Sequence, residues 1–255
     1  MQTLVSTRIL SGTSLEPRFL RQLRDRGFVA LELYATPDTF DLRFTARARS
    51  FRRQLEAAGM RVPWVYLGEA YLPRLGSMLR FEELTATLVA LHAEALVLPR
   101  AAWDAAGLPT ALDSLRTYVQ RAGARLILDA HAPEDRPVVE APDLGFCWDV
   151  APCVHGPEIG EEALARLPRW RLQGVRVAHL RDGHHRDPPG EEEASLLEDL
   201  WPRLAPRTLV YDVEAPGGLA ALGHALDEIR AFHLGERRPS GRRGGGIFWA
   251  SMAPG

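Results

Sequence analysis

Residues 61–99 contain the pattern that decides the fold: "RVPWVYL" is followed by "FEELTATLVALHAEA" and then by "ALVLP". The first and last of these segments are short and apolar, which is typical of buried strands. The middle segment is longer and amphipathic, which is typical of a helix that packs on one face. A strand, a helix and a second strand in that order predict two parallel strands joined by a crossover helix.

The same alternation continues along most of the chain. Strands are expected at residues 3–10, 28–35, 61–67, 95–99, 125–131, 145–150, 175–182 and 207–216, and helices at residues 14–27, 43–60, 81–95, 109–124, 160–170, 191–204 and 217–232. Eight strands connected in this way predict an α/β protein with a closed (β/α)8 TIM barrel, which typically has about 250 residues. An open, doubly wound sheet is the alternative. The first strand is not followed by a glycine-rich loop, which argues against a dinucleotide-binding version of that sheet.

Two parts of the chain depart from the regular alternation. Pro133, Pro137 and Pro142 lie between the fifth and sixth strands, and proline in this segment predicts a truncated fifth helix. Residues 235–255 are rich in arginine and glycine, so we expect a barrel domain at residues 1–234 followed by a short C-terminal tail. Disorder of this tail and its packing on the barrel both remain open.

Composition limits the class of protein. The 255 residues are 46% hydrophobic and 25% charged, and the formal net charge of −2 gives no basic field for nucleic acid. Two cysteines do not make a disulfide framework, and we find no signal peptide and no apolar run long enough to cross a membrane. We therefore expect a cytoplasmic protein with a small-molecule substrate and with no nucleic-acid or membrane partner. Homo-oligomerisation is left open.

Several expected strands end in an ionisable residue that follows an apolar run: Glu32, Asp129, Asp149, His179 and Glu214. In a parallel barrel these strand ends converge on one face, where a buried charge must be paired or bound to metal. Three carboxylates and one imidazole suit Mn²⁺, Mg²⁺ or Zn²⁺, so we expect Asp129, Asp149, His179 and Glu214 to share one divalent ion. The alternative for each single acid is a helix N-cap or an arginine partner.

The segment "RVAHLRDGHHRD" at residues 176–187 holds the imidazole of this set. Alternate residues of a barrel strand face inward. With His179 facing the axis, Val177 and Arg181 share its side. We expect Asp182 to support the loop after the strand and His185 to lie further out over the pocket. The alternative is a charged, solvated loop.

Several segments resemble the xylose-isomerase-like barrel superfamily, which contains sugar and sugar-phosphate isomerases and epimerases and, as a DNA-repair relative, endonuclease IV. The similar segments are "GFVALELYA", "RLILDAH", "CWDVAP", "HLRD" and "PPGEEEASLLEDL", and the resemblance spans about residues 1–234. It implies a divalent ion on the four residues given above. It also implies that Asp129 and Glu214 act as the acid and base that move a proton next to a metal-polarised carbonyl. We expect the substrate to contact Glu32, His131, Asp182 and His185.

The sequence departs from the family pattern at three points. Asp129 stands where the family has glutamate, Pro152 stands where it has a histidine, and the segment after the third strand offers only Glu69 in place of a histidine. The leading hypothesis is a divalent-metal-dependent isomerase or epimerase of a small sugar or sugar derivative. The alternative is a catalytically degenerate barrel that binds a small molecule. An abasic-site endonuclease is less favoured, because its metal cluster needs more histidines than these segments supply.

Overall fold

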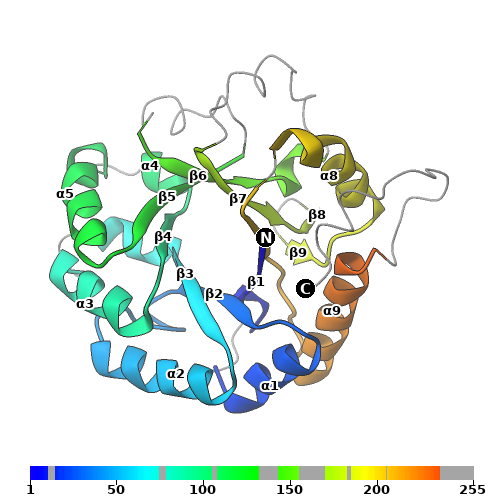
Figure 1. Ribbon diagram of the computed structural model, residues 1–255, viewed down its shortest axis with the longest axis horizontal. Coiled ribbons are helices and arrows are strands. Elements are labelled where there is room, and N and C mark those ends of the chain that lie inside the picture. The colour runs from blue at the N-terminus through cyan, green and yellow to red at the C-terminus, as the bar shows by residue number, and fades with distance from the viewer. Residues whose placement is uncertain are drawn as a thin grey trace.

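In the computed structural model, eight parallel strands form a closed barrel in the order β1, β10, β7, β6, β5, β4, β3, β2 (Figure 1). The structure describes residues 1–10, 15–74, 79–104, 108–131, 143–154, 170–182, 185–204 and 206–235. The strands are β1 (Gln2–Ser6), β2 (Ala30–Ala35), β3 (Arg61–Leu67), β4 (Ala95–Leu98), β5 (Arg125–Ala130), β6 (Gly145–Asp149), β7 (Leu172–Val177) and β10 (Thr208–Tyr211). Because β1 pairs with both β2 and β10, the TIM-barrel prediction is confirmed and the open sheet is excluded.

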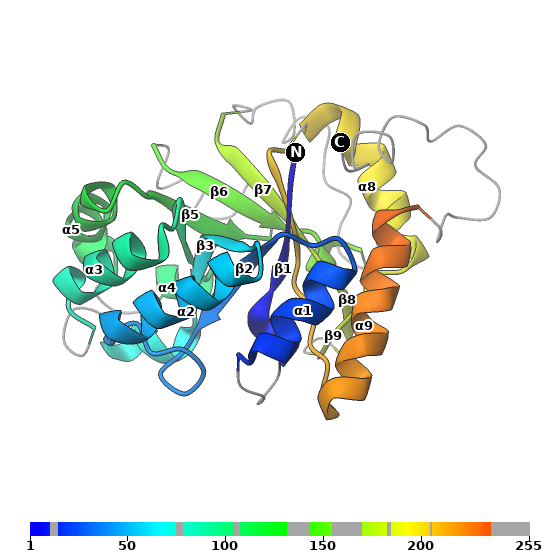
Figure 2. The same cartoon turned by 60° about the horizontal axis from the view of Figure 1, so that its bottom comes forward.

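The helices lie outside the ring of strands (Figure 2). They are α1 (Pro17–Asp25), α2 (Thr45–Ala57), α3 (Phe81–Leu91), α4 (Ala101–Asp104), α5 (Leu108–Arg121), α8 (Glu191–Leu204) and α9 (Gly218–His233), with short 3-10 helices η1 (Thr7–Leu10), η2 (Glu69–Arg74) and η3 (Ala151–Cys153). Within the described ranges, the helices are all too short or too polar to cross a bilayer. The truncated fifth helix, almost all of the helix expected at residues 160–170 and the tail from residue 236 lie outside the described residues. The domain boundary at residue 234 stays a prediction.

The first strand is shorter than expected, because it ends at Ser6 and continues as η1. The backbone N–H of Tyr34 on β2 donates to the hydroxyl of Thr7 at 2.8 Å. This side chain takes the place of a backbone acceptor, so strand pairing stops and the chain turns. Arg8 is thereby placed at the carboxyl end of the barrel.

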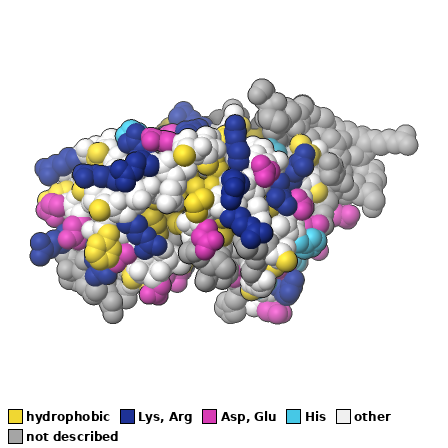
Figure 3. Space-filling view, turned by 90° about the horizontal axis from the view of Figure 1, so that it is seen from below, with side chains coloured by type: hydrophobic (Ala, Val, Ile, Leu, Met, Phe, Trp, Pro, Cys, Tyr) yellow, Lys and Arg dark blue, Asp and Glu magenta, His cyan; other side chains and the backbone are white. Residues whose placement is uncertain are grey.

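The outer surface of the barrel is covered by amphipathic helices. In α1, Pro17 occupies the first turn, where its missing N–H costs nothing, and Phe19, Leu20 and Leu23 are buried against the strands. Figure 3 shows the solvent face over α1 and α2, on which basic side chains gather with acidic ones among them. The apolar side of α1 thus faces the sheet and its charged side faces water.

The core has two layers, because alternate residues of each strand point in opposite directions. Outward-facing residues such as Val175, Val177 and Leu209 pack under the helices. A smaller cluster fills the barrel interior: Leu4, Ala30, Trp64, Tyr66, Ala95, Val97, Ile127, Cys147 and Val210. These described side chains therefore pack the barrel interior.

Trp64 is among the largest fully buried side chains, and a glycine makes room for it. A Cβ atom built on Gly174 of β7 would lie 2.6 Å from Trp64 Cη2 and 3.0 Å from the carbonyl oxygen of Thr208. Neither the ring nor the backbone can give way easily in a closed barrel. Gly174 therefore fixes which side of β7 faces the axis.

We expect Gly174→Ala to lower the free energy of unfolding by about 1–3 kcal/mol through overpacking. Gly223→Ala in the middle of α9 is the matched control, because the nearest atom to its new Cβ is Arg26 Nη2 at 3.7 Å. This control should raise stability by about 0.5–1 kcal/mol, since glycine weakens a helix interior. Chemical denaturation of both variants checks the prediction, and an equal response of the two would contradict it.

Candidate functional site

The barrel interior changes from apolar to polar toward the carboxyl ends of the strands. A residue two positions after an inward-facing one also faces inward. On seven strands this spacing places a polar side chain after an interior residue. The pairs are Leu4 and Ser6, Ala30 and Glu32, Trp64 and Tyr66, Ile127 and Asp129, Cys147 and Asp149, Gly174 and Arg176, and Val210 and Asp212. The alternation therefore builds a buried polar layer at the carboxyl end of the barrel. TIM-barrel enzymes have their active sites at this end.

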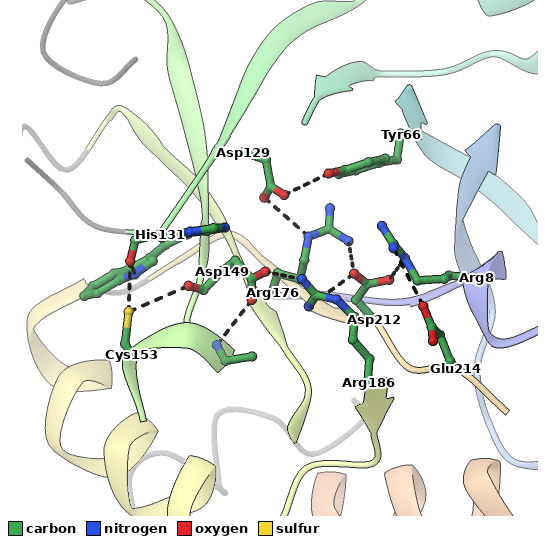
Figure 4. Close-up of polar contacts among 12 residues, drawn as sticks. Arg8, Tyr66, Asp129, His131, Asp149, Cys153, Arg176, Arg186, Asp212 and Glu214 are labelled. Carbon is green, nitrogen blue, oxygen red and sulfur yellow. Dashed lines mark hydrogen bonds and ion pairs between the residues drawn. The ribbon is translucent and has the colours of Figure 1, made fainter. Parts of the chain in front are cut away.

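Arg176 lies at the centre of the polar layer and is buried (Figure 4). Its Nη1 and Nη2 donate to the two carboxylate oxygens of Glu32 at 2.8 Å each, which makes a bidentate pair. Its Nε lies 3.4 Å from Asp129 Oδ1, and its Nη1 lies 3.3 Å from Asp212 Oδ2. Burial alone would lower the pKa of Arg176, but these three carboxylates raise it well above its usual value. Arg176 is therefore a permanent buried cation.

Asp212 joins three arginine side chains. Its Oδ1 lies 3.0 Å from Arg8 Nε, and its Oδ2 lies 3.3 Å from Arg176 Nη1 and 3.4 Å from Arg186 Nη1. Burial alone would raise the pKa of this carboxyl, but the three guanidinium groups hold it well below its usual range. Asp212 is therefore ionised at neutral pH and, from the end of β10, connects Arg8 of η1 to Arg176 of β7.

A short hairpin brings Arg186 over the barrel. Its strands, β8 (His179–Arg181) and β9 (His185–Asp187), pair antiparallel after β7. Arg186 Nη2 donates to Asp149 Oδ2 at 2.6 Å, and Asp149 Oδ1 accepts the backbone N–H of Ala151 at 3.2 Å. Burial alone would lower the pKa of Arg186, but Asp149 and Asp212 raise it. The hairpin is thereby tied to the end of β6 by a charge-assisted hydrogen bond.

Asp129 has a raised pKa, in contrast to Asp212. Its Oδ2 accepts the hydroxyl of Tyr66 at 3.1 Å, and its contact with Arg176 is long at 3.4 Å. Burial raises the pKa of Asp129 to about 7, because Arg176 offsets only part of the cost of desolvation. The whole cluster, which we call the arginine network, comprises Arg8, Arg176, Arg186, Glu32, Asp129, Asp149 and Asp212. Four carboxyls face three arginines, and below about pH 7 the protonated form of Asp129 lowers the negative charge of the network.

One edge of the arginine network is open to solvent. Arg8 is stacked over the ring of Tyr34 at 4.1 Å and lies 3.9 Å from Glu214, while Glu214 Oε2 lies 3.4 Å from His185 Nδ1. The side chains of Arg8, His185 and Glu214 are 21%, 28% and 27% exposed. We call these three residues the mouth edge. They come from three separate segments, and His185 and Glu214 also line a cleft of about 640 Å³ beside the barrel.

The sequence-predicted site residues are only partly brought together. Asp129 and Asp149 lie in the buried network, whereas Glu214 lies at the mouth edge. His179 is on β8, with its Nδ1 2.9 Å from Glu193 Oε1 of α8. Within the ranges that the structure describes, no three histidine, cysteine, aspartate or glutamate side chains are grouped so as to hold a metal ion.

The four residues expected to contact substrate also separate. Glu32 is buried against Arg176, and His185 lies at the mouth edge. The carbonyl oxygen of His131 accepts Trp148 Nε1 at 2.8 Å and Cys153 Sγ at 2.9 Å. Asp182 follows β8 and is exposed, with a positive φ of 53°.

The register expected for residues 175–182 is wrong by one position. Arg176 faces the axis, while Val175 and Val177 pack in the outer core layer, which is the reverse of the alternation that places His179 inward with Val177. The strand also ends at Val177, and the hairpin begins at His179. Gly174 explains this register, because only an inward glycine accommodates Trp64, and a slip of one residue would move every side chain to the other face.

A shared divalent cation on Asp129, Asp149, His179 and Glu214 does not fit this arrangement of side chains. Asp129 and Asp149 each accept an arginine hydrogen bond, and the imidazole of His179 is turned toward Glu193. A divalent ion between the carboxylates would meet guanidinium groups of the same sign. Metal binding by this set stays a prediction, and we derive no chemistry from it.

One arginine and one aspartate of the site carried a signal that sequence reasoning missed. Arg176 and Asp212 follow Gly174 and Val210 at the strand spacing of two, so consistent alternation would have placed both inward. Arg8 and Arg186 lie on η1 and on the hairpin. The strand pattern gave no signal for them, because their positions depend on tertiary contacts.

Comparisons with solved structures find the same barrel in sugar-converting enzymes. No protein-family model matches the sequence, and no curated protein matches it. A sugar phosphate isomerase/epimerase from Parabacteroides distasonis is 12% identical, with a TM-score of 0.61 over 91% of this chain and 92% of that one. A xylose isomerase domain protein from Planctomyces limnophilus is 16% identical, with a TM-score of 0.64 over 91% and 94%.

A third structure is D-psicose 3-epimerase with D-tagatose from Clostridium cellulolyticum, which is 12% identical with a TM-score of 0.63 over 91% of this chain and 96% of that one. At these identities the likeness concerns the fold. The chain shares the barrel fold of these structures, which is the fold that the motif resemblance implied.

We expect the stability contributed by Asp129 to depend on pH. An unfolded aspartate has a pKa near 3.9, whereas burial raises that of Asp129 to about 7. The folded protein then holds a proton that the unfolded chain releases. The contribution of Asp129 to the free energy of unfolding is fully present below about pH 4 and is lost as the pH rises through about 7. This free energy falls by up to about 1.4 kcal/mol per pH unit in that range.

Asp129→Asn is the matched variant, because its amide oxygen can still accept from Tyr66 and the residue does not titrate. The unfolding free energy of wild type minus that of the variant, measured by urea denaturation, should fall between about pH 5 and about pH 8. A difference that is flat or that rises with pH would show that Asp129 is ionised throughout.

Proposed function

We propose that this protein is a small-molecule-binding barrel whose ligand, an unphosphorylated sugar derivative or similar polyol, lies against the mouth edge. The observation that carries the proposal is that Arg8, His185 and Glu214 meet there from three separate segments, each partly exposed, beside a cleft of about 640 Å³. A site of that size holds a small organic molecule, and a few convergent polar groups fix its orientation.

The charges around the cleft indicate the ligand class. Among the described residues, one arginine, Arg181, lines it together with His179, His185 and His224. The acidic residues that line it within the same described part of the chain are Asp187, Glu191, Glu192, Glu193, Glu214 and Glu228. Carboxylates accept hydrogen bonds from hydroxyl groups but repel a phosphate. The cleft therefore favours a neutral polyol over a sugar phosphate.

The fold comparisons support the same ligand class. The epimerase from Clostridium cellulolyticum was solved with D-tagatose, a neutral ketose. That structure concerns another protein at 12% identity, so it supports the choice of test ligands and does not identify the substrate of this chain.

Isomerisation or epimerisation is the second candidate function. It is favoured by two carboxyls in or beside the polar layer, Asp129 and Glu214, which are the pair implied by the family resemblance as acid and base. Binding is preferred because Asp129 is buried behind Arg176 and bonded to Tyr66, whereas Glu214 lies on the open edge. The metal-dependent form of the reaction has less support, because the network carboxylates bond to arginines.

The test is a calorimetric titration of wild-type protein with a panel of ketoses, aldoses and polyols. We expect at least one neutral sugar to bind and Glu214→Ala to weaken that binding by about tenfold or more, since a hydrogen bond to a charged group contributes about 1.5–3 kcal/mol. Glu94→Ala is the control, because Glu94 pairs with Arg61 away from the mouth edge. This variant should bind the sugar with the affinity of wild type.

Each sugar that binds is then incubated with the protein, with and without Mn²⁺, and the products are separated by chromatography. Unchanged sugar supports the binding function, and conversion would establish the isomerase candidate instead. Binding that Glu214→Ala leaves intact would place the site elsewhere and contradict the proposal.

A further inference from the structure

The network carboxylates already have cationic partners within contact distance. Arg176 contacts Glu32, Asp129 and Asp212, and Arg186 contacts Asp149 and Asp212. The guanidinium groups therefore lie where a cation between these carboxylates would lie. Arginine is also suited to this role, because its planar group stays charged and matches a carboxylate in two hydrogen bonds.

We infer that Arg176 and Arg186 take the electrostatic role that a divalent cation has between converging carboxylates, so that this barrel excludes a metal ion and admits one only when an arginine is removed. The inference concerns the chain's own residues and does not depend on the proposed sugar ligand. It predicts a gain of function on deleting a side chain, which is a result that general destabilisation does not produce.

Arg186 is the arginine to remove. It lies on the hairpin outside the barrel strands and its side chain is 15% exposed, whereas Arg176 is enclosed within the barrel. Arg186→Ala leaves Asp149 and Asp212 without one shared partner and opens space between them for a hydrated ion. Arg176 and Arg8 remain to support the interior.

The experiment measures Mn²⁺ binding by equilibrium dialysis and by the electron paramagnetic resonance signal of free Mn²⁺. Wild type and Arg61→Ala should bind Mn²⁺ weakly and equally, because Arg61 forms a surface pair with Glu94. Arg186→Ala should bind one Mn²⁺ about tenfold or more tightly than wild type, the range in which neighbouring residues alter metal affinity. The double variant Arg186→Ala/Asp149→Asn should lose this gain.

Three outcomes would overturn the inference. Tight stoichiometric Mn²⁺ binding by wild type that Asp149→Asn removes would mean that the carboxylates are metal ligands after all. A folded Arg186→Ala protein with wild-type affinity would mean that the arginine does not exclude the ion. A gain that survives Asp149→Asn would place the new site elsewhere. The wild-type measurement decides the first point even if Arg186→Ala does not fold.

Discussion

The bidentate pair between Arg176 and Glu32 is the constraint on which the polar end of this barrel depends. Both groups are buried in a closed ring of strands, where an uncompensated charge is strongly unfavourable. One carboxylate balances one guanidinium, but Arg176 also lies near Asp129 and Asp212. The negative charge of Asp212 is shared with two further cations, Arg8 and Arg186. The composition of the network thus follows from one buried arginine at a strand end.

The same network explains how the interior connects to the surface. Asp212 forms ion pairs with both Arg176 and Arg8. Arg8 in turn lies beside Glu214 at the mouth edge. Asp149 forms an ion pair with Arg186, and this pair fixes the position of the hairpin that also carries His185. The buried charges therefore position the exposed ones, and the rigidity of the barrel extends to the side chains proposed to contact a ligand.

Sequence reasoning predicted the barrel because the spacing of hydrophobic residues within each segment indicates whether that segment is a strand or a helix. The alternation of the two along the chain then indicates the fold. It also found Glu32, Asp129 and Asp149, which end apolar runs. It missed Arg176 because the register was set from His179, whereas Gly174 and Trp64 set it in the structure. The partners Arg8 and Arg186 could not be predicted, since η1 and the hairpin meet the strand ends only in the folded chain. The strand-end acids indicated a need for positive charge but not its source.

The claim that guanidinium groups neutralise these carboxyls is tested most directly by a double-mutant cycle on the central pair, with stability measured by chemical denaturation. Arg176→Met and Glu32→Leu should each lower the free energy of unfolding by about 3–5 kcal/mol, because each leaves a buried charge without its partner. The double variant removes both charges and should lose far less than the sum of the two. Additive losses, within about 0.5 kcal/mol, would show that the two side chains do not compensate each other and would contradict the account.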